Sequence, residues 1–207
     1  WTIRTATGWQ IAWNSVAFGN STFVAVANDP YNNGFRYRAM TSTDGVTWTE
    51  RATSAVSAPD YPWESVAYGG GTFVAVQSKT GYGNPVNTST DGISWTSYAS
   101  GVDNEWRSVT YGGGLFVAVA SSGTGNRVMT SPDGITWTAR TSAADYNWRS
   151  VTYGGGLFVA VASSGTGNRV MTSPDGITWT ARTSAADYNW RSVTYGGGLF
   201  VAVASSG

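Results

Sequence analysis

The chain of 207 residues carries twelve Lys and Arg against twelve Asp and Glu, so its formal net charge is zero, and it contains neither His nor Cys. Zero net charge argues against nucleic-acid binding through long-range attraction. The two missing residue types exclude disulfides, thiolate or imidazole metal ligands and a Ser-His-Asp triad. No apolar run approaches the roughly 18–20 residues of a membrane span. We therefore expect no metal site, no cofactor and no membrane insertion.

The chain is built from internal repeats. Two diverged units at 13–62 and 63–105 precede two identical units at 106–147 and 148–189, and residues 190–207 copy the start of the same unit. A fixed period of this length is the mark of a repeat architecture. Identity this complete points either to recent duplication or to design.

Each unit predicts four short strands. In the third unit they are "WRSVTY" at 106–111, "LFVAVAS" at 115–121, "RVMTS" at 127–131 and "ITWTART" at 135–141, with Gly, Pro, Asp or Asn at every break. Four strands in a repeat of about 40–50 residues are typical of a β-propeller blade. The sequence therefore predicts an all-β fold, a single propeller domain over 1–207 made of four-stranded antiparallel blades.

The two ends of the chain predict a shared last blade. Residues 1–5, "WTIRT", match the fourth strand "WTART", whereas 190–207 supply only the first two strands. We expect five blades, the fifth assembled from 190–207 and 1–12 and lacking one strand. The unpaired edge at 199–205 would then favour a homo-oligomer. Further repeats or closure by another copy are the alternatives.

One motif, "SPDGITWT" and its variants, closes every complete unit. Asp-Gly between strands is a hairpin signal, and the Asp and Ser side chains can hydrogen-bond the turn backbone. A calcium loop would need several oxygen ligands at short spacing, and each turn has one Asp. We predict structural turns and packing anchors at Asp44, Trp48, Asp91, Trp95, Asp133, Trp137, Asp175 and Trp179.

The pattern Ser-x-Asp-Gly-x-x-Trp resembles the Asp-box repeats of sialidase-like propellers. With "GGGLFVAVASSG" before it, the repeat is similar to bacterial and phage propellers akin to photosystem II assembly factors. The resemblance covers essentially the whole chain and implies a propeller fold, with the boxes as structural elements away from the catalytic face of sialidases. The usual box has one more residue between Asp and Gly, so the turn here is a residue shorter.

Loop lengths predict where a ligand binds. The turns after the first and third strands keep their length, while those after the second and fourth vary and, by antiparallel connectivity, share one face. Loops on a rigid scaffold often carry function, and aromatic and polar residues there suit a glycan or protein ligand. The alternative is that they are solvated loops covering blade ends. The candidate residues are Tyr31, Asn32, Asn33, Arg36, Tyr37, Tyr82, Asp145, Tyr146, Asn147, Asp187, Tyr188 and Asn189.

Catalysis is the less favoured interpretation. Glycosidases need paired carboxylates, and Glu occurs only at Glu50, Glu64 and Glu105, outside the identical repeats. Arginines such as Arg107 and Arg149 recur as copies, which suits repeated binding or structural pairing. The leading hypothesis is a non-catalytic recognition or adhesion propeller. The alternatives are a structural repeat protein, natural or engineered, and a glycoside hydrolase. Low charge and abundant Ser, Thr and Asn favour an extracellular or surface location.

Overall fold

The computed structural model describes residues 12–28, 37–52, 62–78 and 86–206, and these residues form β-strands joined by turns and loops, with no helix among them. The first sheet contains β1 (Ala12–Gly19), β2 (Thr22–Asn28), β3 (Tyr37–Ser42) and β4 (Thr49–Ala52). The second contains β5 (Trp63–Gly69), β6 (Thr72–Gln77), β7 (Val86–Ser89) and β8 (Thr96–Tyr98). The third contains β9 (Trp106–Gly112), β10 (Leu115–Ala120), β11 (Val128–Ser131) and β12 (Thr138–Arg140). The fourth contains β13 (Trp148–Gly154), β14 (Leu157–Ala162), β15 (Val170–Ser173) and β16 (Thr180–Arg182). The last contains β17 (Trp190–Gly196) and β18 (Leu199–Ala204).

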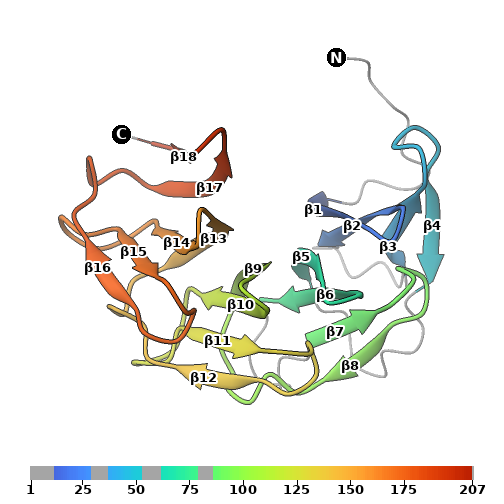
Figure 1. The fold of residues 1–207 in the computed structure, drawn as a ribbon, viewed down its shortest axis with the longest axis horizontal. Coiled ribbons are helices and arrows are strands. Elements are labelled where there is room, and N and C mark those ends of the chain that lie inside the picture. The colour runs from blue at the N-terminus through green and yellow to red at the C-terminus, as the bar shows by residue number, and fades with distance from the viewer. Residues whose placement is uncertain (1–11, 29–36, 53–61, 79–85, 207) are drawn as a thin grey trace.

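The sheets are arranged as propeller blades. Strands pair in chain order within each sheet, every pair antiparallel. In Figure 1 the strands β1, β5, β9, β13 and β17 follow one another around a common centre, and β4, β8, β12 and β16 lie outermost. The predicted all-β propeller is thereby confirmed. The blades form an open arc in this view, with β1 and β17 at its two ends.

The fifth blade has two strands within the described residues, β17 and β18. The strand predicted to complete it from the other chain end, residues 1–5, lies outside the described residues. Its assembly from both ends therefore stays a prediction.

The turn between the first two strands of each blade is the tightest in the fold. Gly112 pairs with Leu115, and the two intervening glycines, Gly113 and Gly114, have φ of +55° and +84°. Positive φ at both central residues is the requirement of a two-residue type I′ hairpin. Gly112 is needed for a different reason, because a Cβ there would overlap the ring of Tyr153 from the next blade.

The Ser-x-Asp-Gly turns join the third and fourth strands. In the third blade, Asp133 Oδ1 accepts the N–H groups of Ile135 and Thr136 at 2.8 and 2.9 Å. Ser131 Oγ donates to the same carboxylate oxygen at 2.9 Å and accepts the Gly134 N–H at 2.8 Å. These bonds replace strand pairing by a side-chain network, as in Asx-turns.

This network shortens the fourth strand relative to the sequence-based expectation. The sequence predicts a strand from residue 135, but β12 begins at Thr138, and Thr130 pairs with Thr138 across a connection formed by 131–137. The cause is that Asp133 captures the first two N–H groups that the strand would otherwise offer to β11. Trp137 therefore ends the turn, with its indole Nε1–H donating to Gly134 O at 2.9 Å.

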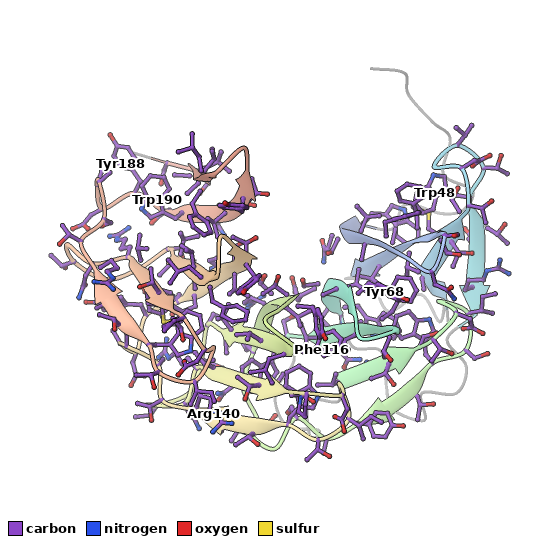
Figure 2. All side chains as sticks on the ribbon, in the orientation of Figure 1. Trp48, Tyr68, Phe116, Arg140, Tyr188 and Trp190 are labelled. Atoms are coloured by element: carbon purple, nitrogen blue, oxygen red, sulfur yellow. The ribbon has the colours of Figure 1, made fainter. Side chains whose placement is uncertain are left out.

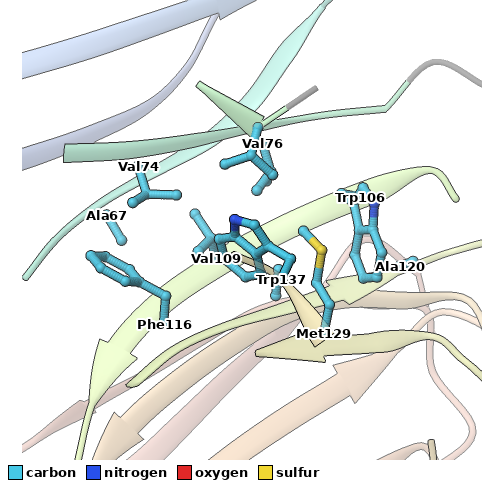
Figure 3. Close-up of a cluster of buried hydrophobic side chains, with 11 residues drawn as sticks. Ala67, Val74, Val76, Trp106, Val109, Phe116, Ala120, Met129 and Trp137 are labelled. Carbon is cyan, nitrogen blue, oxygen red and sulfur yellow. The ribbon is translucent and has the colours of Figure 1, made fainter. Parts of the chain in front are cut away.

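The core lies between consecutive blades. Trp106, Phe116 and Met129 of the third blade pack with Val74 and Val76 of the second, all at most 1% exposed (Figure 3). A buried Trp removes about 150–250 Å² from water, or about 4–6 kcal/mol as an upper bound. Because this burial depends on the neighbouring blade, each blade is stabilised mainly by its neighbours.

We predict an acid-sensitive contribution from the four turn aspartates. The N–H groups of Thr47 and Val46, with Ser42, lower the pKa of Asp44 from 3.8 to about 2, and equivalent bonds lower the pKa of Asp133 and Asp175. A lowered folded-state pKa stabilises the fold above the ordinary pKa, and this stabilisation is lost as the pH falls through the folded-state pKa.

The free energy of unfolding, measured by urea denaturation, should therefore fall as the pH goes from about 4 to about 2. A variant with Asn at Asp44, Asp91, Asp133 and Asp175 should show a smaller fall, because the amide does not titrate. Equal pH dependence of the two proteins would contradict this assignment.

Candidate functional site

A β-bulge recurs in every innermost strand, directly after its first tryptophan. In β13, Trp148 pairs with Ala162 and Ser150 with Val161, so Arg149 is the additional residue. A bulge re-aims the side chain of the inserted residue and often lies next to a functional site. The five bulge residues are Asn14, Glu64, Arg107, Arg149 and Arg191.

The bulges lie on the face predicted to bind a ligand. Each innermost strand begins where the variable loop from the preceding blade ends, and the Arg149 Nε–H donates to Ser163 Oγ, just beyond β14, at 3.0 Å. The Ser-x-Asp-Gly turns lie at the opposite ends of the strands, because the pairing is antiparallel. The bulge residues therefore form the inner rim of the variable face.

Arg107 is fully engaged by carboxylates at this rim. Its Nη1 lies 3.3 Å from Glu64 Oε1 of the preceding bulge, and its Nη2 lies 2.7 Å from Glu105 Oε2. Burial would raise the pKa of Glu105, but hydrogen bonds from Ser121 and Arg107 outweigh it and hold that pKa below its usual range. The contact between Arg107 and Glu64 shows that neighbouring bulge side chains reach one another across the blade boundary.

Arg149 and Arg191 have no equivalent carboxylate contact in the described ranges. Each donates its Nε–H to a serine after the second strand, Ser163 or Ser205, at 3.0 Å. Asn replaces Glu105 in their blades, and the preceding bulge residue is an Arg. Within the described ranges, neither guanidinium lies within 4 Å of a carboxylate.

The electrostatics of these two arginines favour an anion. Burial lowers the pKa of Arg149, and the positive charges of Arg107 and Arg191 lower it further, although the carboxylates of Glu105 and Glu64 act in the opposite direction. Arg nevertheless stays charged in proteins, so a partly buried cation lies beside like charges. Paired guanidinium groups in this setting bind carboxylates, phosphates or sulfates through charge-assisted hydrogen bonds.

The predicted loop residues Asp145 and Asn147 are held by an arginine clamp. Asp145 Oδ1 accepts the Gly125 N–H at 2.8 Å and lies 3.6 Å from Arg127 Nε. Arg127 also donates to Asn147 Oδ1 at 3.3 Å and to the carbonyls of Gly123 and Ser121 at 2.9 and 3.1 Å. The clamp therefore joins the two variable loops of one blade boundary.

The same clamp recurs one blade later. Arg169 Nε lies 3.7 Å from Asp187 Oδ1, and its Nη1 donates to Asn189 Oδ1 at 3.4 Å and to Tyr188 O at 2.8 Å. The polar atoms of Asp187 and Asn189 are thus used, at least in part, to position the loops.

The two predicted loop tyrosines differ in exposure. The ring of Tyr146 packs over Gly165 and lies 6.0 Å from the Trp148 ring, and it is half-buried. Tyr188 is 45% exposed and lies 6.0 Å from Trp190 at one end of the arc, where Figure 2 labels both. Tyr188 therefore offers an open aromatic surface just before β17, the strand that carries Arg191.

The remaining candidates lie elsewhere. Tyr31, Asn32, Asn33, Arg36 and Tyr82 are outside the described residues, and Tyr37 begins β3, where its backbone pairs with Ala52. In the described ranges, Asp and Glu form no group of three that could hold a metal ion. The same ranges hold no helix with the length and apolar character needed to cross a bilayer.

The sequence-based site missed Arg149 and Arg191. The sequence shows that the residue after the first Trp changes from Asn to Glu to Arg along the chain, in a strand that otherwise changes little. That change in charge was the available signal. The bulge that gives this position its special orientation has no signature in the residues themselves.

We predict that the clamp stabilises the variable face. Arg127→Met should lower the free energy of unfolding by about 2–3 kcal/mol, because charged hydrogen bonds to partly buried carbonyls are lost. The control is Arg182→Met on outermost strand β16, where one bond to Thr172 Oγ1 at 2.9 Å is lost from an exposed side chain. If chemical denaturation shows that both variants lose the same free energy of unfolding, a special role for the clamp is ruled out.

No protein-family model and no curated protein matches the sequence. Solved structures with the same fold include YCF48 from Cyanidioschyzon merolae, with a TM-score of 0.61 and 19% identity over 90% of this chain and 60% of that one. YCF48 bound to a D1 peptide has a TM-score of 0.62 and 18% identity, over 93% of this chain and 62% of that one. A nidogen/laminin complex has a TM-score of 0.64 and 13% identity, over 93% of this chain and 72% of that one. A thermostable family-43 glycoside hydrolase has a TM-score of 0.58 and 10% identity, over 99% of this chain and 97% of that one.

The chain thus spans about 60% of the length of the YCF48 chains. With identities between 10% and 19%, these likenesses establish the fold, a β-propeller with repeated antiparallel blades.

Proposed function

We propose that the chain is a non-catalytic recognition propeller that binds a protein ligand on its variable face and holds an anionic group of that ligand at Arg149 and Arg191. One observation carries the proposal. Of the three successive bulge arginines, Arg107 has two carboxylate partners, and the other two have none within the described residues.

Arg107 indicates how the ligand group would bind. Its Nη1 and Nη2 groups donate to carboxylate oxygens of Glu64 and Glu105, while its Nε–H donates to Ser121 Oγ at 2.8 Å. The identical repeat gives Arg149 the same serine contact through Ser163. A ligand carboxylate at Arg149 would occupy the place that Glu105 occupies at Arg107, without rearrangement of the strand.

A protein ligand is supported by the surroundings and by the fold. The exposed Tyr188 ring adds flat apolar surface just before β17, the strand that carries Arg191, and exposed aromatic and Arg side chains are common in protein recognition. Propellers of this fold occur in protein complexes, YCF48 with a D1 peptide and nidogen with laminin. An acidic side chain or a chain-terminal carboxylate of a peptide would supply the anionic group.

A glycoside hydrolase is the second candidate, favoured by the likeness to a family-43 enzyme. Its natural carboxylate pair would be Glu64 and Glu105 at the rim. Both are bound to one guanidinium, and the pKa of Glu105 is lowered, whereas a general acid at neutral pH requires a raised pKa. This arrangement supports recognition over hydrolysis.

The test is binding to an array of acidic peptides, each printed with a free and with an amidated C-terminus. The chain should bind a subset with a free carboxylate or acidic side chains, and rising salt should weaken that binding. Replacing both Arg149 and Arg191 by Met should weaken binding at least about tenfold, since charged hydrogen bonds contribute about 1.5–3 kcal/mol each.

The matched control replaces Arg140 and Arg182 by Met, the arginines of the outermost strands β12 and β16. It removes the same net charge and should leave binding unchanged. Equal weakening in both double variants would overturn the arginine site. If the chain hydrolyses oligosaccharides and Glu64→Gln abolishes that hydrolysis, the recognition proposal is overturned and the hydrolase function takes its place.

A further inference from the structure

The interface between consecutive blades repeats with the same residues. A tyrosine ring of each innermost strand from β5 onward packs on the last glycine of the preceding innermost strand, where a Cβ would overlap the ring. The pairs are Tyr68 on Gly19, Tyr111 on Gly69, Tyr153 on Gly112 and Tyr195 on Gly154. A serine hydroxyl of one blade also accepts the N–H of a valine in the next. Ser108 Oγ to Val151 N and Ser150 Oγ to Val193 N both measure 3.1 Å.

A third contact completes this interface. A valine of the second strand lies against the glycine of the next blade's Ser-x-Asp-Gly turn, as Val74 does on Gly134 and Val117 on Gly176. Each blade therefore presents two different faces. The leading face carries the serine, the strand glycine and the valine, and the trailing face of the next blade carries the valine N–H, the aromatic ring and the turn glycine.

The last blade exposes a complete leading face. Gly196 has no atom within 4 Å of a Cβ built on it, unlike its four equivalents. Leu199, Val201 and Val203 are 67%, 54% and 57% exposed, whereas Val117 and Val119, which occupy the two valine positions in the third blade, are fully buried.

The first blade exposes the matching trailing face. Val16 is 59% exposed, whereas its equivalents Val66 and Val109 are each 5% exposed. Phe18, which occupies the position of the packing tyrosines, is 57% exposed. Gly45 meets only Phe23 of its own blade, although its equivalents meet a valine from the preceding blade.

We infer that the last blade of one copy binds the first blade of a second copy, head to tail, and forms one more interface of the repeated kind. Phe18 of one copy would pack on Gly196 of the other, Ser192 Oγ would accept the Val16 N–H, and Val201 would lie against Gly45. The occupant is a second copy because both halves of the interface belong to this chain, yet they stand apart at the two ends of the arc (Figure 2).

This association differs from pairing at the β18 edge and does not depend on the proposed function. The two faces are not self-complementary, so the contact is heterologous. Heterologous contacts produce closed rings of two or more copies, or directional chains of copies. The exposed valines and Phe18 form apolar surface of the kind that marks protein contacts.

Sedimentation velocity over a wide range of concentration tests the inference. The unmodified chain should associate into dimers or larger species as concentration rises. Val16→Asp and Gly196→Trp should each be monomeric, because each spoils one of the two faces. Both positions are open to solvent, so both variants should fold with an unchanged circular dichroism spectrum. Ile135→Asp, which alters an exposed apolar residue on an internal turn at 44% exposure, should associate like the unmodified chain.

The decisive measurement mixes the two monomeric variants. Val16→Asp retains an intact last blade and Gly196→Trp an intact first blade, so the mixture should form a species of twice the monomer mass and nothing larger. If the unmodified chain is monomeric, the inference is overturned in favour of closure within one chain. Association that survives in both variants, or variants that stay monomeric when mixed, would overturn it as well.

Discussion

The packing of an aromatic ring on a glycine of the preceding blade is the contact on which the rest of the structure depends. The ring of Tyr153 occupies the space where Gly112 would carry a side chain. This contact brings consecutive innermost strands close enough for Ser108 Oγ to accept the Val151 N–H. It also brings the bulge residues near enough for Arg107 to reach Glu64 across the boundary. Core packing, rim electrostatics and the repeat spacing all follow from it.

The repeated sequence predicts the fold but does not indicate where the candidate site lies. Four short strands, tight turns and a fixed period are visible in the residues, because turn chemistry and alternation are local properties. Bulges depend on pairing between strands, so the orientation of Arg149 could not be read from "WRSVTY". The length of β12 depends on which N–H groups Asp133 captures, and that competition between side chain and strand is likewise invisible in an alternating pattern.

The predicted loop residues also show that residue type alone does not determine a residue's role. Asp145, Tyr146 and Asn147 have the side chains of a binding loop, and their types alone favour contact with a ligand. Arg127 lies far from them in sequence and engages Asp145 and Asn147 from a different loop. A residue's type indicates what it can bind, while its neighbours determine what it does bind. Tyr188 differs from Tyr146 only through its surroundings, since the two repeats are identical.

The identical interfaces have a consequence for how such a chain changes over time. A 42-residue segment can be gained or lost between the copies at 106–147 and 148–189 without altering any residue at a blade boundary. Recombination between the copies would therefore lengthen or shorten the arc in whole blades while the leading and trailing faces at its ends stay the same. The number of blades can thus change without a change in the residues of the two end faces. The curvature of the arc limits how many blades fit.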